Sequence, residues 1–207
     1  ATVFHALYQA GGVTDIGTLR NIRVLRSGRE VASVDIYKYL FHGDSKDDIR
    51  LEEGDIVLVP SYDLLVEVTG CVKRPMRYEM EAGEPLSQLL AYAGGFTGDA
   101  YGREVRVVRT MGGEHELFNL DSVGFGTFAL MDGDSVAVGR VLDRYANRIE
   151  VQGAVYRPGM YELGEGTHTV RELIGRAEGL REDAFRGRAL LFRERDDLTP
   201  EIVAVDL

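Results

Sequence analysis

The chain has 207 residues, of which 44% are hydrophobic and 28% charged, a composition typical of a folded globular chain and not of a disordered or fibrous one. Its 34 acidic and 24 basic residues give a formal charge of −10, which repels a phosphate backbone, so we expect no nucleic-acid partner. The sequence contains no uncharged apolar stretch of about 18 residues, and its single cysteine, Cys71, excludes a disulfide framework and a thiolate metal site.

The first predicted element is a helix at the start of the chain. Residues 2–12 end in Gly11 and Gly12, the pattern of a helix that runs into a glycine C-cap. Because the sequence opens directly on this helix, we expect it to be part of a longer protein.

A hairpin is predicted over residues 66–80. Apolar and polar residues alternate in 66–69 and again in 76–80, which indicates two half-buried strands. Between them, Pro75 fixes the backbone φ angle and Gly70 permits a bulge or a close approach of another backbone.

A short helix and three further strands follow the hairpin. Residues 85–95 begin with Pro85, end in two glycines and place four apolar side chains on one helical face: Leu86, Leu89, Leu90 and Ala93. Strands are predicted at 104–109, 115–120 and 135–138, the last after a tight turn at 132–134. One helix among about five strands predicts an α+β unit whose helix covers one face of a curled sheet.

The whole pattern repeats along the chain. Residues 66–78 match residues 149–161, 83 positions later, and after a one-residue insertion Arg109 falls on Arg193. A further copy aligns residues 10–14 with 93–97 and residues 51–59 with 130–138. We therefore expect three modules: module 1, residues 1–62, without its N-terminal hairpin; module 2, residues 63–146, complete; and module 3, residues 147–207, truncated at its C-terminal end.

These motifs together resemble the soluble ligand-binding β-grasp (SLBB) domain of Wza-like outer-membrane polysaccharide export proteins. The resembling elements are V-x-G-x-V-x-R-P-G-x-Y, a helix ending in A-G-G, and L-x-x-G-D-x-V-x-V. In module 2 they are carried by Val68, Gly70, Val72, Arg74, Pro75, Tyr78, Leu86, Leu89, Leu90, Ala93, Gly94, Gly95, Asp99, Ala100, Gly133 and Asp134. The resemblance implies an α+β fold of tandem β-grasp modules, each a curled mixed sheet of about five strands covered by one short helix.

The resemblance also implies a function. It implies a non-catalytic part of a capsule or exopolysaccharide export apparatus at the periplasmic face of the outer membrane. The implied partners are the polysaccharide polymer, further copies of the same chain in a homo-oligomer, and an inner-membrane polysaccharide co-polymerase. The alternative is a module that binds a soluble ligand or a carbohydrate and has no channel role.

The candidate ligand contacts lie in the hairpins. Arg74 and Tyr78, with their repeat counterparts Arg157 and Tyr161, are the candidates, because a tyrosine ring can stack on a sugar. Strand alternation nevertheless favours a place for both tyrosines at the edge of the core. Turn and cap geometry alone explains a further set of residues: Gly70, Pro75, Gly94, Gly95, Gly153, Pro158 and Gly179.

The sequence predicts no catalytic residue, metal site or cofactor. The four histidines, His5, His42, His115 and His168, lack metal-ligand spacing. Residues 44–55 lack the glycine and the final glutamate of a calcium loop, and residues 124–126 lack the third glycine of a dinucleotide site. We therefore expect a protein that is not an enzyme.

Overall fold

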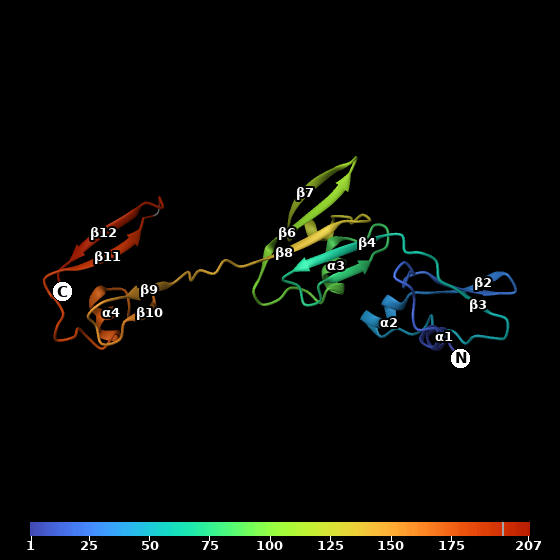
Figure 1. The fold of residues 1–207 in the computed structure, drawn as a ribbon, viewed down its shortest axis with the longest axis horizontal. Helices are drawn as coiled ribbons and strands as arrows, with labels where there is room; N and C mark the ends of the chain where they lie inside the picture. Colours follow the sequence, from blue (N-terminus) through green and yellow to red (C-terminus); the bar gives the residue numbers. More distant parts are fainter. Residues whose placement is uncertain (196) are drawn as a thin grey trace. The chain divides into compact units, whose positions relative to one another are not determined.

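The computed structural model describes residues 1–195 and 197–207 of the chain (Figure 1). They form two compact units, Ala1–Leu142 and Asp143–Leu207, which are described separately. The α+β class and the β-grasp-like modules predicted from the sequence are confirmed.

Module 2 is built on one five-stranded mixed sheet. Its strands are β4 (Leu65–Gly70), β5 (Met76–Glu79), β6 (Ala100–Met111), β7 (Glu114–Asp121) and β8 (Ser135–Arg140), in the order β5-β4-β8-β6-β7. Strand β8 lies at the centre, parallel to β4 and antiparallel to β6. Strand β8, the last strand of the module in chain order, therefore joins the β4–β5 pair to the β6–β7 pair in one sheet.

Helix α3 (Leu86–Tyr92) covers one face of this sheet (Figure 1). Alternate strand residues such as Val66, Val68 and Val107 are 0% exposed, as are Leu86 and Leu89 of the helix. Burial of each such side chain contributes about 1.5–3 kcal/mol, so the alternation seen in the sequence supplies the core. A short 3-10 turn, η1 (Gly124–Gly126), joins β7 to the segment before β8.

Gly70 ends β4 beside the central strand. Its φ is +82°, and a Cβ atom built on it would overlap the carbonyl oxygen of Val138. Only glycine fits this position, because the backbones of β4 and β8 approach too closely for any side chain.

Module 1 has a three-stranded sheet and two helices. Its elements are α1 (Val3–Gln9), β1 (Ile22–Arg26), β2 (Arg29–Val34), α2 (Ile36–His42) and β3 (Ile56–Leu58), with strand order β2-β1-β3. The predicted first helix is α1, which begins at the N-cap Thr2. Helix α2 was not predicted from the sequence; it begins at Asp35, whose carboxylate accepts from the Tyr37 backbone N–H, and ends at Gly43 with φ +68°.

In its described residues, 143–195 and 197–207, the second unit has one helix and four strands. These are β9 (Arg148–Val151), β10 (Gly159–Glu162), α4 (Val170–Arg176), β11 (Ala189–Glu194) and β12 (Pro200–Val205). The strands form two separate antiparallel pairs, β10-β9 and β11-β12. A capping box between Thr169 and Glu172 starts α4 and satisfies the free amides of its first turn.

Candidate functional site at the junction of modules 1 and 2

Helix α2 of module 1 packs its aromatic side chains into the core of module 2. Tyr37 and Phe41 contact Tyr92 of α3, with ring centroids 5.1 and 4.6 Å away. Tyr78 of β5 lies 6.4 Å from Tyr92 in the same cluster. The two modules therefore share one hydrophobic cluster, and α2 is the element that makes them a single compact unit.

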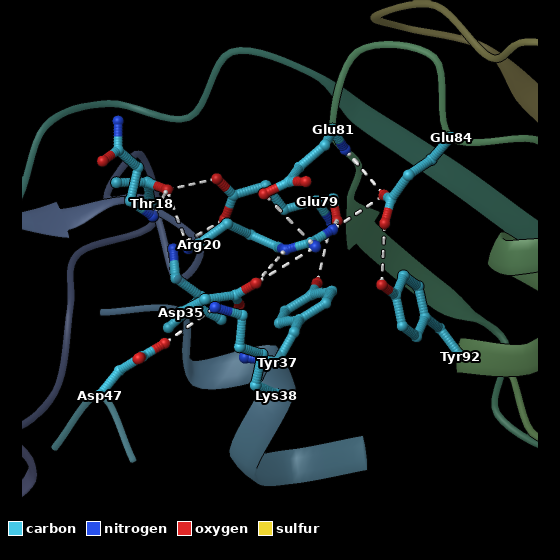
Figure 2. A network of polar contacts seen from close by, with 12 residues as sticks. Thr18, Arg20, Asp35, Tyr37, Lys38, Asp47, Glu79, Glu81, Glu84 and Tyr92 are labelled. Carbon is cyan, nitrogen blue, oxygen red and sulfur yellow. Dashed lines mark hydrogen bonds and ion pairs between the residues drawn. The ribbon is translucent and has the colours of Figure 1, made fainter. Parts of the chain in front are cut away.

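Arg20 is the centre of a polar network above this cluster (Figure 2). Its guanidinium donates to Asp35 of its own module at 3.2 Å and to Glu84 of module 2 at 2.8 Å. The same group lies 4.9 Å above the Tyr37 ring, and its side chain is only 8% exposed. A buried guanidinium that binds carboxylates from both modules holds them together through charge-assisted hydrogen bonds.

Glu79 anchors the other side of the junction. One carboxylate oxygen accepts from the Thr18 hydroxyl and the other from the Leu19 backbone N–H at 2.7 Å. The backbone N–H of Glu79 donates in turn to the Tyr37 hydroxyl at 2.9 Å. Glu79 thus bonds strand β5 to module 1 through both its side chain and its main chain.

Glu84 links the network to helix α3. It accepts from Arg20, from the Glu81 backbone N–H at 2.8 Å and from the Tyr92 hydroxyl at 3.0 Å. Figure 2 shows Tyr92 and Arg20 pointing toward the Glu84 carboxylate. The loop before α3 is held by these bonds at the module boundary.

Burial controls the protonation of the junction tyrosines. Loss of solvent raises the pKa of the Tyr37 hydroxyl to about 12 and that of Tyr92 to about 12, although the Arg20 charge opposes both shifts. For Arg20, burial alone lowers the guanidinium pKa, but the hydrogen bonds and charges of Glu84 and Asp35 outweigh it and raise the pKa. At neutral pH the site therefore has a charged arginine beside two neutral phenols.

A pocket of about 390 Å³ opens beside the network. Its lining combines the buried Arg20 and Asp35 with the more exposed Lys38, Asp47 and Glu81. Lys38 and Asp47 pair across it at 2.9 Å (Figure 2). The lining is polar and carries both signs of charge, and such a surface suits a hydroxyl-rich ligand better than an apolar one.

The candidate tyrosines both serve local structure. Tyr78 is 3% exposed and donates from its hydroxyl to the Arg74 carbonyl at 2.8 Å. Tyr161 donates in the same way to the Arg157 carbonyl at 2.7 Å. Each tyrosine therefore holds the turn of its own hairpin, and the ring of Tyr78 is covered by the junction cluster.

The candidate arginines are exposed. Arg74 lies over the Phe41 ring at 5.4 Å, whereas Arg157 pairs with Glu178 at 2.7 Å. Glu178 has φ +62°, the left-handed conformation that Gly94 adopts at the equivalent position of module 2. Arg74 and Tyr78 belong to the first unit, and Arg157 and Tyr161 belong to the second.

An arginine–aspartate pair recurs in modules 1 and 2, and its aspartate is the last residue of the L-x-x-G-D motif. Arg109 donates to both oxygens of Asp134 at 2.9 and 2.7 Å, and Arg26 makes the same fork with Asp55 at 2.8 Å for both bonds. The Arg26 guanidinium and the Glu52 backbone N–H lower the pKa of Asp55 to about 2. The repeated arginine and aspartate thus tie the turn before the last strand to its neighbour.

The junction network was not predicted from the sequence. Arg20 aligns with Arg103, which is exposed, so the repeat gives no sign that this arginine is buried in module 1. The available signal was the stretch Asp35-Ile36-Tyr37 after a strand, an N-cap followed by aromatic residues at helical spacing.

Other predicted features lie at the surface. All four histidines are exposed, and within residues 1–195 and 197–207 no cluster of three or more His, Cys, Asp or Glu side chains has the arrangement of a metal site. No helix in the described part of the chain is long and apolar enough to cross a membrane.

Three segments of the chain, residues 1–35, 65–119 and 148–199, match the SLBB domain family. Together they cover more than half of the chain, and the chain belongs to this family. SLBB domains are soluble ligand-binding domains found in polysaccharide export proteins, and the family is one of binding domains and not of catalysts.

Proposed function

We propose that this chain is a structural part of a Wza-like apparatus that exports a capsule or exopolysaccharide across the outer membrane from its periplasmic face. The proposal includes three modules, residues 1–62, 63–146 and 147–207, and a homo-oligomer that contacts the polymer and an inner-membrane polysaccharide co-polymerase. Nothing in the proposal requires catalysis.

The joint between modules 1 and 2 is the observation that supports this proposal most. A flexible linker would let two binding modules move independently, whereas here Arg20 and Glu79 bond across a shared aromatic cluster. A conduit wall must keep its shape while a polymer passes, and a buried, bonded joint between tandem modules provides that stiffness.

Deletion of the gene in the source organism tests the export role. We expect polysaccharide to accumulate inside the cells and to disappear from their surface, measured by quantifying the polymer in both fractions. Full-length protein carrying Arg77→Ala should restore export. This substitution removes only an exposed ion pair, in which Arg77 lies 3.9 Å from Glu67. The Arg20→Ala protein should restore it poorly at equal periplasmic abundance. Unchanged surface polymer in the deletion strain would refute the proposal.

The oligomeric state of the full-length protein tests the channel aspect separately. We expect a ring-sized assembly by light scattering across a concentration series, because a channel wall must associate laterally. A strict monomer at all concentrations would remove the channel role.

The pocket beside Arg20 favours a second candidate, a module that binds a soluble ligand or carbohydrate without a channel role. Its volume of about 390 Å³ is within the range of small-molecule sites. Titration of oligosaccharides from the host polymer into the chain by calorimetry distinguishes the two. Two results together would favour this candidate: the protein is monomeric, and it binds an oligosaccharide saturably in a way that Lys38→Ala abolishes.

A further inference from the structure

The β11–β12 hairpin of module 3 has one apolar face that is open to solvent (Figure 1). Because side chains alternate along a strand, Leu190 and Phe192 of β11 share a face with their cross-strand partners Ala204 and Ile202. Leu190 is 47% exposed, Phe192 69% and Ile202 62%. These four residues are called the outer face of the hairpin below.

The corresponding face of module 2 is polar. By the repeat, the cross-strand pair Leu190 and Ala204 takes the place of the pair Arg106 and Asn119. Both of these module 2 residues are exposed, although the sheet that carries them has all five strands, because α3 covers the other side. A face that stays in water normally has polar side chains, so the apolar residues of module 3 indicate a contact surface.

A hollow of about 490 Å³ adjoins the outer face near the turn of the hairpin. Four of its lining residues are apolar: Phe192, Leu198, Pro200 and Ile202. Leu198 is 75% exposed and has φ +65°, a left-handed conformation that strains a leucine backbone. Glycine or asparagine would form such a turn with less strain, so the geometry of the turn does not explain a leucine there.

Opposite charges stand at the two ends of the outer face. Arg188 lies two positions before Leu190, and Glu194 lies two positions after Phe192, so alternation places both on the outer side. Both charged residues are exposed. The arginines that bind Glu201 lie on the opposite face of the hairpin. Along β11 the outer face is therefore positive at one end, apolar in the middle and negative at the other end.

This order of charges is complementary to itself. When two copies of the face stack with their β11 strands antiparallel, Arg188 of each copy meets Glu194 of the other. In the same arrangement, Leu190 of each copy lies over Phe192 and the hollow of the other. Every contact is made twice, as in any two-fold interface between identical surfaces. The charges thus favour a second copy of this chain as the occupant.

We propose that the outer face of the β11–β12 hairpin binds the same face of a second copy of this chain about a two-fold axis. The two hairpins pack face to face about 10 Å apart, with apolar side chains interdigitated and an ion pair at each end. The association is weak and reversible, because interfaces that bury less than about 1,200 Å² are typical of transient contacts. The contact goes beyond the export role, which neither requires nor excludes it.

Sedimentation equilibrium of the 207-residue chain over a concentration series measures this association. We expect a reversible equilibrium between monomer and dimer. Phe192→Ser should weaken the dimer by more than about tenfold, because it removes the aromatic side chain at the centre of the contact. The Phe192 side chain is 69% exposed, so the fold should persist, as circular dichroism will check. Leu117→Ser is the matched control on the equivalent face of module 2, where the leucine is 59% exposed, and should leave the dimer unchanged.

Two charge reversals test the antiparallel arrangement. Arg188→Glu alone, or Glu194→Arg alone, places like charges at both ends of the contact and should weaken the dimer about tenfold. In an equimolar mixture of the two variants, opposite charges meet again at both ends. The mixture should therefore associate about as tightly as the unchanged chain.

Three results would overturn the proposal. They are a chain that stays monomeric at every concentration, a dimer that Phe192→Ser leaves intact, and a mixture of the two charge variants that is no heavier than either variant alone. A monomeric chain that binds host oligosaccharide, and loses this binding on Phe192→Ser, would assign the outer face to a saccharide instead.

Discussion

Arg20 is a cation bound by carboxylates from two modules, and its removal leaves Asp35, whose side chain is 8% exposed, and Glu84, whose side chain is 19% exposed, without this counter-charge. Breaking a buried ion pair by deleting one partner costs about 3–5 kcal/mol, because the remaining charge stays desolvated. We expect Arg20→Ala to lower the free energy of unfolding of the first unit by this amount. Urea unfolding followed by near-ultraviolet circular dichroism of the junction tyrosines measures it.

Arg77→Ala is the matched control for Arg20→Ala. Arg77 also pairs with a glutamate, but its side chain is 69% exposed, and exposed pairs contribute less than about 1 kcal/mol. Equal effects of the two substitutions would show that the Arg20 network does not stabilise the joint.

The junction tyrosines predict a loss of stability at alkaline pH. Burial raises the pKa of Tyr37 and of Tyr92 to about 12, above the value of about 10 in an unfolded chain. The stabilising contribution is therefore complete below pH 10 and is lost as the pH rises toward 12, by about 1.4 kcal/mol per pH unit for each tyrosine. Urea midpoints at pH 8, 10 and 11 should fall accordingly.

Two phenylalanine substitutions check the origin of this pH dependence. Tyr92→Phe should reduce the alkaline slope, at a cost near neutral pH of about 1 kcal/mol for its lost hydrogen bond to Glu84. Tyr8→Phe changes a ring that is 87% exposed and should leave the slope as it is. An unaltered slope in Tyr92→Phe would contradict the assignment.

Among the elements, those of module 2 were well predicted because local pattern and burial agree. Alternation identified β4 and β5, strand-favouring residues after a tight turn identified β8, and helical spacing identified α3, since their apolar residues face one core. Helix α2 was missed because two of its aromatic residues, Tyr37 and Phe41, pack against the next module and not against the core of its own module.

The repeat also predicted less of the site than of the fold. The repeat aligned Arg26 with Arg109 and Asp55 with Asp134. Such an alignment does not show that the arginine and the aspartate of one module contact each other. The β1–β3 and β6–β8 pairings bring them together, and these are contacts between strands distant in the chain.

Gly70, at the end of β4, and Gly153, its repeat counterpart after β9, allow the cost of an added Cβ to be compared in the two hairpins. Both have left-handed backbones, so an added Cβ costs about 1–2 kcal/mol in each, but only at Gly70 does it also strike the central strand. We expect Gly70→Ala to lower the free energy of unfolding by about 2–5 kcal/mol, and Gly153→Ala by only about 1–2 kcal/mol. Native-state hydrogen exchange of β4–β8 and of β9–β10 reports each value, and equal losses would contradict a close approach at Gly70.

For the whole molecule, the excess of acidic residues bears on the proposed export role. With a formal charge of −10, the chain repels an anionic polysaccharide, and this repulsion reaches about 30 Å at 0.01 M salt but only about 10 Å at 0.1 M. A surface that repels its cargo weakly allows the cargo to slide, whereas a surface with clustered cations would hold it.

We therefore expect immobilised chain to retain almost no anionic polysaccharide at 0.01 M salt and slightly more at 0.1 M, because salt screens the repulsion. A neutral dextran of the same length is the control, and its retention should not depend on salt. The opposite trend, tight retention at low salt that is lost at 0.1 M, would show that the 24 basic residues gather on one face. In that case the chain would act as a polymer binder, and the second of the two proposed functions would take precedence over a conduit wall.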